Sequence, residues 1–248
     1  MKPEQVNHYE LGLKAQFLDR RATVNFSAFW TEIEDYQATV TNGQLRVLRG
    51  YLANAGKVRT RGIEIDSAFG PVSHLSLYAN GACTDASYIR FVDAPCPPEL
   101  AGGPAATALN PASPAATPGG FGPANGDISG QRLPGVSKWA FSYGAEYNLP
   151  IRIAATDSQF YIGYDDSYRS RFSSNPSRSI FTDVAGYLIS NFRIGVKARN
   201  KWNVFGWVRN AFGQNYFDLL ALQAGNTGLV VGQPGDPRTF GGTISTRF

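Results

Sequence analysis

The sequence predicts an all-β chain whose strands form an antiparallel transmembrane β-barrel. Three observations lead to this fold class. Apolar residues recur at every second position in several segments, no run of 18 apolar residues could form a membrane helix, and short and long connections alternate. The segment 237–248 keeps its alternation to the last residue, as expected of a strand that must stay paired in lipid.

Nine segments have the composition and period of strands. In chain order they are 6–18, 22–37, 53–69, 74–84, 137–148, 158–168, 186–198, 202–212 and 237–248. In the first, Tyr9, Leu11 and Leu13 oppose Glu10 and Lys14, so one face suits lipid and the other suits water. The fifth segment has the same pattern, with aromatic residues at 139, 141, 143 and 147.

The connections distinguish a barrel from a soluble β-sandwich, which also has many short strands. Short links are expected at 19–21, 70–73, 149–157 and 199–201, and each is followed by a long one, at 38–52, 85–136, 169–185 and 213–236. Bacterial barrels place short turns on the periplasmic side and long loops outside. Such barrels have an even number of strands, so nine strands indicate part of a larger barrel whose sheet stays open.

Composition narrows the function classes. The chain is 43% hydrophobic, 13% aromatic and 17% charged, with a net charge of +4. Its Lys and Arg residues are scattered among 19 acidic residues and form no basic stripe, so we expect no nucleic acid partner. The residues after Met1 lack the features of a signal peptide, which favours the C-terminal piece of a longer exported precursor over a cytosolic protein.

Five motifs in order resemble one family. They are the opening KPEQVNHYELGLKAQFLDRRATVNFSAFWTEIEDYQ, then NAGKVRTRGIEID (54–66), LPGVSKWAFSYGAEY (133–147), VRNAFGQNY (208–216) and PRTFGGTISTRF (237–248). In this order they resemble the C-terminal portion of the β-barrel of TonB-dependent outer-membrane receptors. The resemblance covers essentially the whole chain outside the long loops.

The resemblance implies a fold and a function. It implies that residues 1–248 supply about nine strands of a 22-stranded barrel, with 85–136 as a long extracellular loop and with the plug domain and earlier strands absent. It implies a receptor in the outer membrane of a Gram-negative bacterium for uptake of a scarce nutrient, with a ferric siderophore favoured. The implied partners are outer-membrane lipid and lipopolysaccharide, the barrel-assembly machinery, a small-molecule ligand such as an iron chelate, and TonB only through the absent plug. The alternative is a passive porin-like channel.

Several residues have expected roles within this fold. Arg209, Asn210, Phe212 and Tyr216 match the family's strand-end motif, and we interpret them as structural, with ligand contact as the alternative. The resemblance also implies that Phe248, preceded by Ile244 and Phe240, is a signal for barrel assembly.

The two cysteines, Cys83 and Cys96, are predicted to form a disulfide, because an even count in an oxidising compartment favours pairing. Two free thiols are the alternative. The segment 97–126 that follows is rich in Pro, Ala and Gly and lacks periodicity, so we expect it to be mobile.

Arg169, Arg171 and Arg178 could contact an anionic loop ligand or the phosphates of lipopolysaccharide, or could simply form a solvated loop. Charges on the inward face, among them Glu10, Glu146 and Arg193, should form salt bridges along the lumen.

No catalytic, cofactor or metal site is predicted. The only histidines are His8 and His74, and no G-x-S-x-G motif occurs. A metal site would need more ligands than the sequence brings together near the cysteines. We therefore do not expect an enzyme.

Overall fold

The computed structural model describes residues 1–41, 50–92, 94–95, 125–176, 179–198, 202–222 and 229–246. Nine long strands form one antiparallel sheet, and each lies beside the next one along the chain. They are β1 (Gln5–Phe17), β2 (Ala22–Thr41), β3 (Gly50–Phe69), β4 (Leu75–Arg90), β7 (Trp139–Ile153), β8 (Thr156–Arg169), β11 (Tyr187–Ala198), β12 (Trp202–Arg209) and β15 (Thr239–Thr246). All nine predicted segments are confirmed as strands. None of the described residues belongs to a helix long and apolar enough to cross a membrane.

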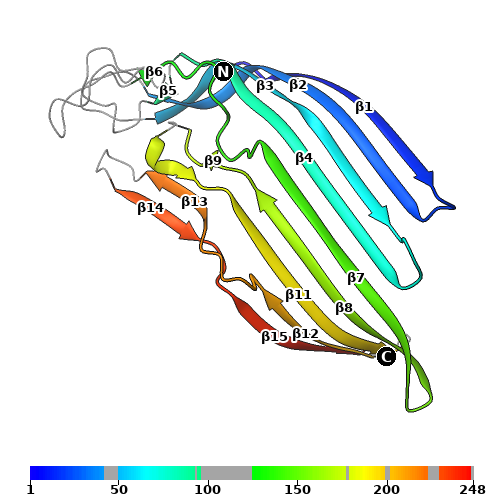
Figure 1. The fold of residues 1–248 in the computed structure, drawn as a ribbon. Coiled ribbons are helices and arrows are strands. Elements are labelled where there is room, and N and C mark those ends of the chain that lie inside the picture. The colour runs from blue at the N-terminus through cyan, green and yellow to red at the C-terminus, as the bar shows by residue number, and fades with distance from the viewer. Residues whose placement is uncertain are drawn as a thin grey trace.

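The sheet is open. Its order begins with β1 and ends with β15, so each of these strands has one neighbour in the described part of the chain. Figure 1 shows the two edge strands on opposite sides of a twisted, curved sheet. This arrangement confirms the prediction of a partial barrel with consecutive strands paired.

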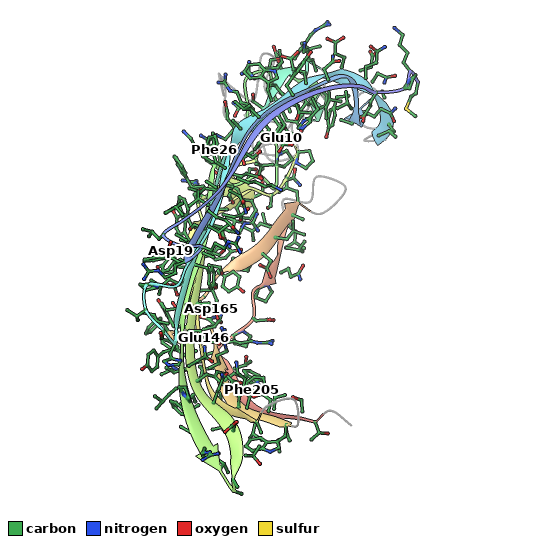
Figure 2. The ribbon with its side chains drawn as sticks, turned by 90° about the vertical axis from the view of Figure 1, so that its right-hand side faces the viewer. Glu10, Asp19, Phe26, Glu146, Asp165 and Phe205 are labelled. Carbon is green, nitrogen blue, oxygen red and sulfur yellow. The ribbon has the colours of Figure 1, made fainter. Side chains whose placement is uncertain are left out.

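The strand register sorts the side chains onto two faces, because residues directly opposite each other on neighbouring strands share a face. One row across the first seven strands is apolar and reads Leu13, Phe26, Ile65, Gly81, Phe141, Tyr168 and Leu188. The adjacent row is mostly polar and reads Lys14, Asn25, Asp66, Asn80, Ser142, Ser167 and Ile189. In Figure 2, Phe26 lies on the convex side of the curved sheet and Glu10 on the concave side.

The convex face is apolar and exposed. Leu11 is 74% exposed, Ile244 is 75% exposed and Phe240 is 81% exposed. In a soluble β-sandwich this face would be covered by a second sheet, but none of the described strands lies over it. The described long strands therefore form one curved sheet and not the two packed sheets of a sandwich.

Tight turns join consecutive strands at one end of the sheet, hereafter the inner end; the opposite end is the outer end. Arg21 connects two of these turns by hydrogen bonds. Its backbone N–H and its Nε both donate to Leu18 O at 3.1 Å. Its carbonyl accepts from Gly70 N at 2.8 Å, and its Nη1 donates to Pro71 O at 3.4 Å. The β1–β2 turn is thus fixed against the β3–β4 turn.

Short elements at the outer end were not predicted. They are β5 (Ala94–Pro95) with β6 (Asn125–Gly126), β9 (Phe172–Ser173) with β10 (Asp183–Val184), β13 (Phe217–Leu222) with β14 (Val230–Pro234), and the 3-10 helix η2 (Ile180–Thr182). Two small cores stabilise them. One contains Val58, Tyr88, Phe91, Ala94 and Ile128, and the other contains Phe172, Val184 and Tyr187.

Several predicted boundaries differ from the structure by a few residues, and two differ by five or more. The strand expected to end at residue 84 continues to Arg90, because the outer half of β3 pairs with it as far as Lys57. The predicted link 149–157 is mostly strand, and the turn consists of Ala154 and Ala155, whose φ angles are 47° and 62°. Pro150 is tolerated there because the pairing of β4 with β7 stops at Tyr147, which leaves that edge of β7 without a partner.

Glycines on the concave face let large side chains lie flat on the sheet. Gly144 lies directly opposite Tyr78, and a Cβ at Gly144 would come within 2.6 Å of the Tyr78 ring and 2.5 Å of Tyr164 O. Gly12, in β1, has more space, since the atom nearest to an added Cβ would be Phe26 O at 3.8 Å. The packing around Gly144 therefore has no room for a side chain, whereas the packing around Gly12 does.

We predict that Gly144→Ala destabilises the full-length protein by about 1–3 kcal/mol, because the added methyl group overpacks against backbone as well as the Tyr78 ring. Gly12→Ala is the matched control and should change stability little. The measurement is the free energy of unfolding of the detergent-solubilised barrel in urea. Equal stability of the two variants would contradict this packing account.

Candidate functional site

The concave face carries a charged cluster at its centre, formed by Glu146 on β7, Asp165 on β8 and Arg193 on β11, hereafter the concave-face cluster. Arg193 Nη2 lies 3.0 Å from Glu146 Oε2, and Arg193 Nη1 lies 2.9 Å from Asp165 Oδ1. One guanidinium group thus binds carboxylates on two other strands. Figure 2 shows Glu146 and Asp165 next to each other on the sheet.

A glycine makes this arrangement possible. The register places Gly163 directly between Glu146 on one side and Arg193 on the other. A Cβ at Gly163 would lie 2.7 Å from Arg193 Nε, so a larger residue would block the guanidinium from crossing β8. The ion pair between β7 and β11 therefore depends on the missing side chain of β8.

The remaining carboxylate oxygens of the concave-face cluster are also hydrogen-bonded. Asn148 Nδ2 donates to Glu146 Oε1 at 3.0 Å, and Asn191 Nδ2 donates to Asp165 Oδ2 at 2.8 Å. Lys197 lies nearby with its Nζ 5.4 Å from the centroid of the Tyr161 ring. The result is a polar, partly exposed surface with fixed charges of both signs.

A second polar group lies on the same face at β1 and β2. His8 Nδ1 and Thr31 Oγ1 share a hydrogen bond of 2.7 Å, and His8 Nε2 lies 3.5 Å from Glu10 Oε2. Ser27 Oγ donates to Glu10 Oε1 at 2.9 Å rather than to the histidine.

His74, the other histidine, lies in the inner turn between β3 and β4 with a φ of 75°. Among the described residues, no group of three or more His, Cys, Asp or Glu could hold a metal ion.

Asn210 closes the outer end of β12. It is 3% exposed and has a φ of 47°. Its Nδ2 donates to Gln214 O at 2.8 Å and to Asp236 O at 3.0 Å, and its Oδ1 accepts from Gln214 N at 2.8 Å. Its backbone N–H donates to Asn191 Oδ1 at 3.1 Å. These bonds join the two ends of the loop between β12 and β15.

The other residues of the strand-end motif make ring contacts. The Arg209 guanidinium lies over the Trp207 ring at 4.9 Å, and Phe212 packs edge-on against Phe192 at 6.2 Å. The Tyr216 ring lies 4.3 Å from that of Tyr187. Burial, together with the negative charge of Asp218, raises the pKa of Tyr216 above its usual range.

Hydrogen bonds join three segments at the outer end of the sheet: the connection between β8 and β11, the β13–β14 hairpin and the segment before β7. We call them the outer loop unit. Ser174 Oγ donates to Leu220 O at 2.5 Å and accepts from Leu220 N at 3.0 Å, which links the β8–β11 connection to β13. Gly135 N donates to Ser173 O at 2.7 Å, which links the segment before β7 to the same connection. In Figure 2 the β13–β14 hairpin stands on the concave side of the sheet.

Two of the three arginines selected from the sequence, Arg169 and Arg171, contact other groups of the protein. Arg169 Nη2 donates to Gly135 O at 3.1 Å, and its guanidinium lies 4.4 Å from the Phe172 ring centroid. Arg171 Nη2 lies 2.8 Å from Asp183 Oδ2. Arg178 is outside the described residues.

The cysteine and terminal predictions are only partly within the described residues. Cys83 lies in the wall, in β4, opposite Ile63 and Trp139. Cys96 is outside the described residues, so the disulfide stays a prediction. Phe240 and Ile244 lie on the exposed convex face of β15. Phe248 is outside the described residues.

Two acidic residues of β8, Asp165 and Asp166, were not predicted to have a role. They are adjacent in the sequence and therefore face opposite sides of the sheet. Asp165 joins the concave-face cluster, and its position two residues beyond Gly163 on the same face was the available signal. Asp166 lies on the convex face, is 2% exposed, and accepts a hydrogen bond from Tyr164. It lies directly opposite Tyr143 and Ser190. No pattern in the sequence indicated that a carboxylate on that face would be covered by neighbouring side chains.

An open antiparallel sheet with an exposed apolar convex face and a polar, ion-paired concave face is part of the wall of a large transmembrane β-barrel. The family model described as "TonB dependent receptor-like, beta-barrel" matches residues 1–211. The chain belongs to this family.

Solved structures have the same fold. The ferric yersiniabactin uptake receptor FyuA from Yersinia pestis superposes with a TM-score of 0.66 at 17% identity, over 97% of this chain and 29% of that one. The siderophore receptor PiuA from Acinetobacter baumannii gives 0.64 at 15% identity, over 98% and 28%. The ferric-catecholate import receptor Fiu from Escherichia coli K12 gives 0.62 at 20% identity, over 100% and 28%. The chain thus spans less than a third of the length of these receptors.

We predict that Arg193 and Glu146 are energetically coupled. In a double-mutant cycle with Arg193→Met and Glu146→Gln, the coupling energy should be about 0.5–1 kcal/mol, since the pair is only partly buried. The control cycle combines Glu146→Gln with Lys14→Met, because Lys14 lies on β1, far along the sheet from β7. Unfolding of the full-length barrel is the measurement, and additivity in both cycles would contradict the ion pair's contribution.

Proposed function

We propose that the chain supplies nine strands and several outer loops to a TonB-dependent receptor that imports a scarce nutrient across the outer membrane of a Gram-negative bacterium. Membership of the receptor family supports this proposal, and so does the polar concave face, which suits a lumen. A ferric siderophore is the favoured nutrient, because the three receptors compared above are named for siderophores or their iron complexes.

The concave-face cluster would then face the interior of the intact barrel. Two carboxylates and a guanidinium held across three strands present fixed partners for charged and polar groups of a plug domain. TonB would act through that plug and not through the strands of this chain. The barrel wall itself would have no catalytic role, in agreement with the relation to transport receptors and not to enzymes.

The outer loop unit would form part of the entrance. Its segments are fixed to each other by the Ser174 and Gly135 hydrogen bonds and by the bonds of Asn210. A preorganised entrance costs less conformational entropy when a ligand binds. We therefore place ligand contact on this unit and on the lumen rather than on the convex face.

The barrel-assembly machinery is a further proposed partner. The exposed convex side chains Phe240 and Ile244 would contribute to its recognition of the last strand, together with the terminal Phe248.

We predict that deletion of the full-length gene abolishes saturable uptake of one radiolabelled ferric siderophore during iron limitation. Uptake should return with the wild-type gene on a plasmid and should be lost again when TonB is removed. This dependence separates the receptor from a passive channel, because flux through a channel rises linearly with concentration and needs no TonB. Unchanged uptake of every ferric siderophore and other scarce nutrient tested would contradict the proposal.

A further inference from the structure

The boundary between β8 and β11, hereafter the β8–β11 seam, joins two hairpins without a tight turn. The two-residue turn Ala154–Ala155 joins β7 to β8, and residues 199–201 join β11 to β12. By contrast, the longer connection 170–186 runs between β8 and β11. A tight turn fixes the register of the strands that it joins, whereas a long loop leaves other registers open. Side chains must therefore help to select the register at this seam.

Alternation of apolar and polar residues selects the register only to within two residues, because the side-chain period of a strand is two. A shift of one residue would turn the wrong side chains to the convex face, but a shift of two restores the pattern. The convex positions along the seam are mostly apolar or aromatic: Phe160, Ile162, Tyr164 and Tyr168 on β8, and Leu188, Phe192, Ile194 and Val196 on β11. Most of the seam would thus tolerate a two-residue shift.

Asp166 and Ser190 are the exceptions among these convex positions, and they lie directly opposite each other. Asp166 is 2% exposed and Ser190 is 3% exposed. The Tyr164 hydroxyl donates to Asp166 Oδ2, and the hydroxyls of Ser190 and Tyr143 hydrogen-bond to the same carboxylate. Tyr143 is directly opposite Asp166 on β7. The carboxylate therefore has hydroxyl donors on its own strand and on both neighbouring strands.

A two-residue shift at the seam would remove the donor on β11. Asp166 would then lie opposite Leu188 or Phe192 in place of Ser190, depending on the direction of the shift. Burying a carboxylate beside an apolar side chain is unfavourable, and a hydrogen bond to a charged group is among the stronger ones in proteins. The native register is therefore favoured over both shifted registers.

The polar contacts on the concave face select the register less strictly. Asn191 lies directly opposite Asp165 and donates to it at 2.8 Å. Arg193 lies two residues further along β11, and its long side chain still reaches Asp165 at 2.9 Å. A shift that placed Arg193 directly opposite Asp165 would keep this ion pair. The convex face therefore discriminates between registers that the concave face would accept.

We propose that the hydrogen bond between Ser190 and Asp166 selects the register of β8 against β11 when the two hairpins pair. It gives a role to a buried carboxylate on the same face as Ile162 and Ile194, where an apolar residue would otherwise be expected. The proposal concerns the assembly of the barrel wall and does not depend on the identity of the imported nutrient.

The test is disulfide cross-linking across the β8–β11 seam in the full-length protein with all native cysteines replaced. Ile162→Cys is combined with Ile194→Cys, which is directly opposite in the native register. In two further proteins it is combined with Phe192→Cys or Val196→Cys, which would be opposite only after a two-residue shift. Directly opposite residues are about 5 Å apart and diagonal neighbours about 7–8 Å. Since Cα atoms more than about 7 Å apart are not bridged, the disulfide reports the register.

With Asp166 and Ser190 unchanged, the disulfide should form almost only between positions 162 and 194. Asp166→Val or Ser190→Ala should raise the yield of the shifted disulfides about tenfold, because the native register then loses a hydrogen bond to a charged group. Tyr143→Phe is the matched control. It removes a hydroxyl from the same carboxylate, but on β7, whose register with β8 is fixed by the turn Ala154–Ala155. This control should keep the native disulfide pattern.

Two outcomes would overturn the proposal. Asp166→Val and Ser190→Ala could both give only the native disulfide, or Tyr143→Phe could shift the register as much as Ser190→Ala. If Asp166→Val does not fold, Ser190→Ala decides the question, because it leaves the Tyr143 and Tyr164 donors in place. Nutrient uptake by the wild-type protein is measured in parallel, so a receptor that imports nothing but cross-links as expected refutes only the proposed function.

Discussion

The ladder of backbone hydrogen bonds between the nine strands is the constraint on which the rest of the structure depends. In lipid a backbone N–H or C=O group has no water to bind, so every strand must pair with its neighbours. Pairing fixes the register, and the register fixes which side chains share a face. A shift of one residue in β1 would place Lys14, in place of Leu13, beside Phe26 on the convex face. The exposed apolar face and the charged concave face are therefore consequences of the same ladder.

Side chains then adapt to the crowding that this ladder creates. Gly163 lets Arg193 reach across β8 to Glu146, and Gly144 leaves room for the Tyr78 ring. The concave face thus combines long side chains with glycines on neighbouring strands. This packing holds the charges of the concave face in place through neighbouring strands of the same sheet.

The sequence predicted the strands well because alternation is a local signal. Tyr9, Leu11 and Leu13 identify the first strand without reference to any other part of the chain. The boundaries of β4 and β7 were harder, since Asp85–Arg90 is strand only because β3 extends beside it, and Pro150 is tolerated only because β4 stops pairing earlier. The hairpin β13–β14 also could not be predicted, because it is held by contacts with Ser174 and Tyr187, far away in the sequence.

The candidate site was predicted in part. Glu146 and Arg193 were expected to face inward and to form salt bridges, and the structure pairs them. Asp165 was missed because its partner, Arg193, lies on another strand. Only the register of β8 and β11 shows that the two side chains are close. The contact of Asp166 with Ser190 was missed for the same reason, since a residue's face can be read from the sequence but its cross-strand neighbours cannot.

The central claim is that the convex face meets lipid and the concave face meets an aqueous lumen. The most direct test is spin labelling of consecutive β2 positions, from Val24 to Ala28, in the full-length protein in lipid vesicles with all native cysteines replaced. Labels at Val24, Phe26 and Ala28 should collide with oxygen dissolved in lipid, and labels at Asn25 and Ser27 should not. Accessibility without a period of two along this strand would contradict the account.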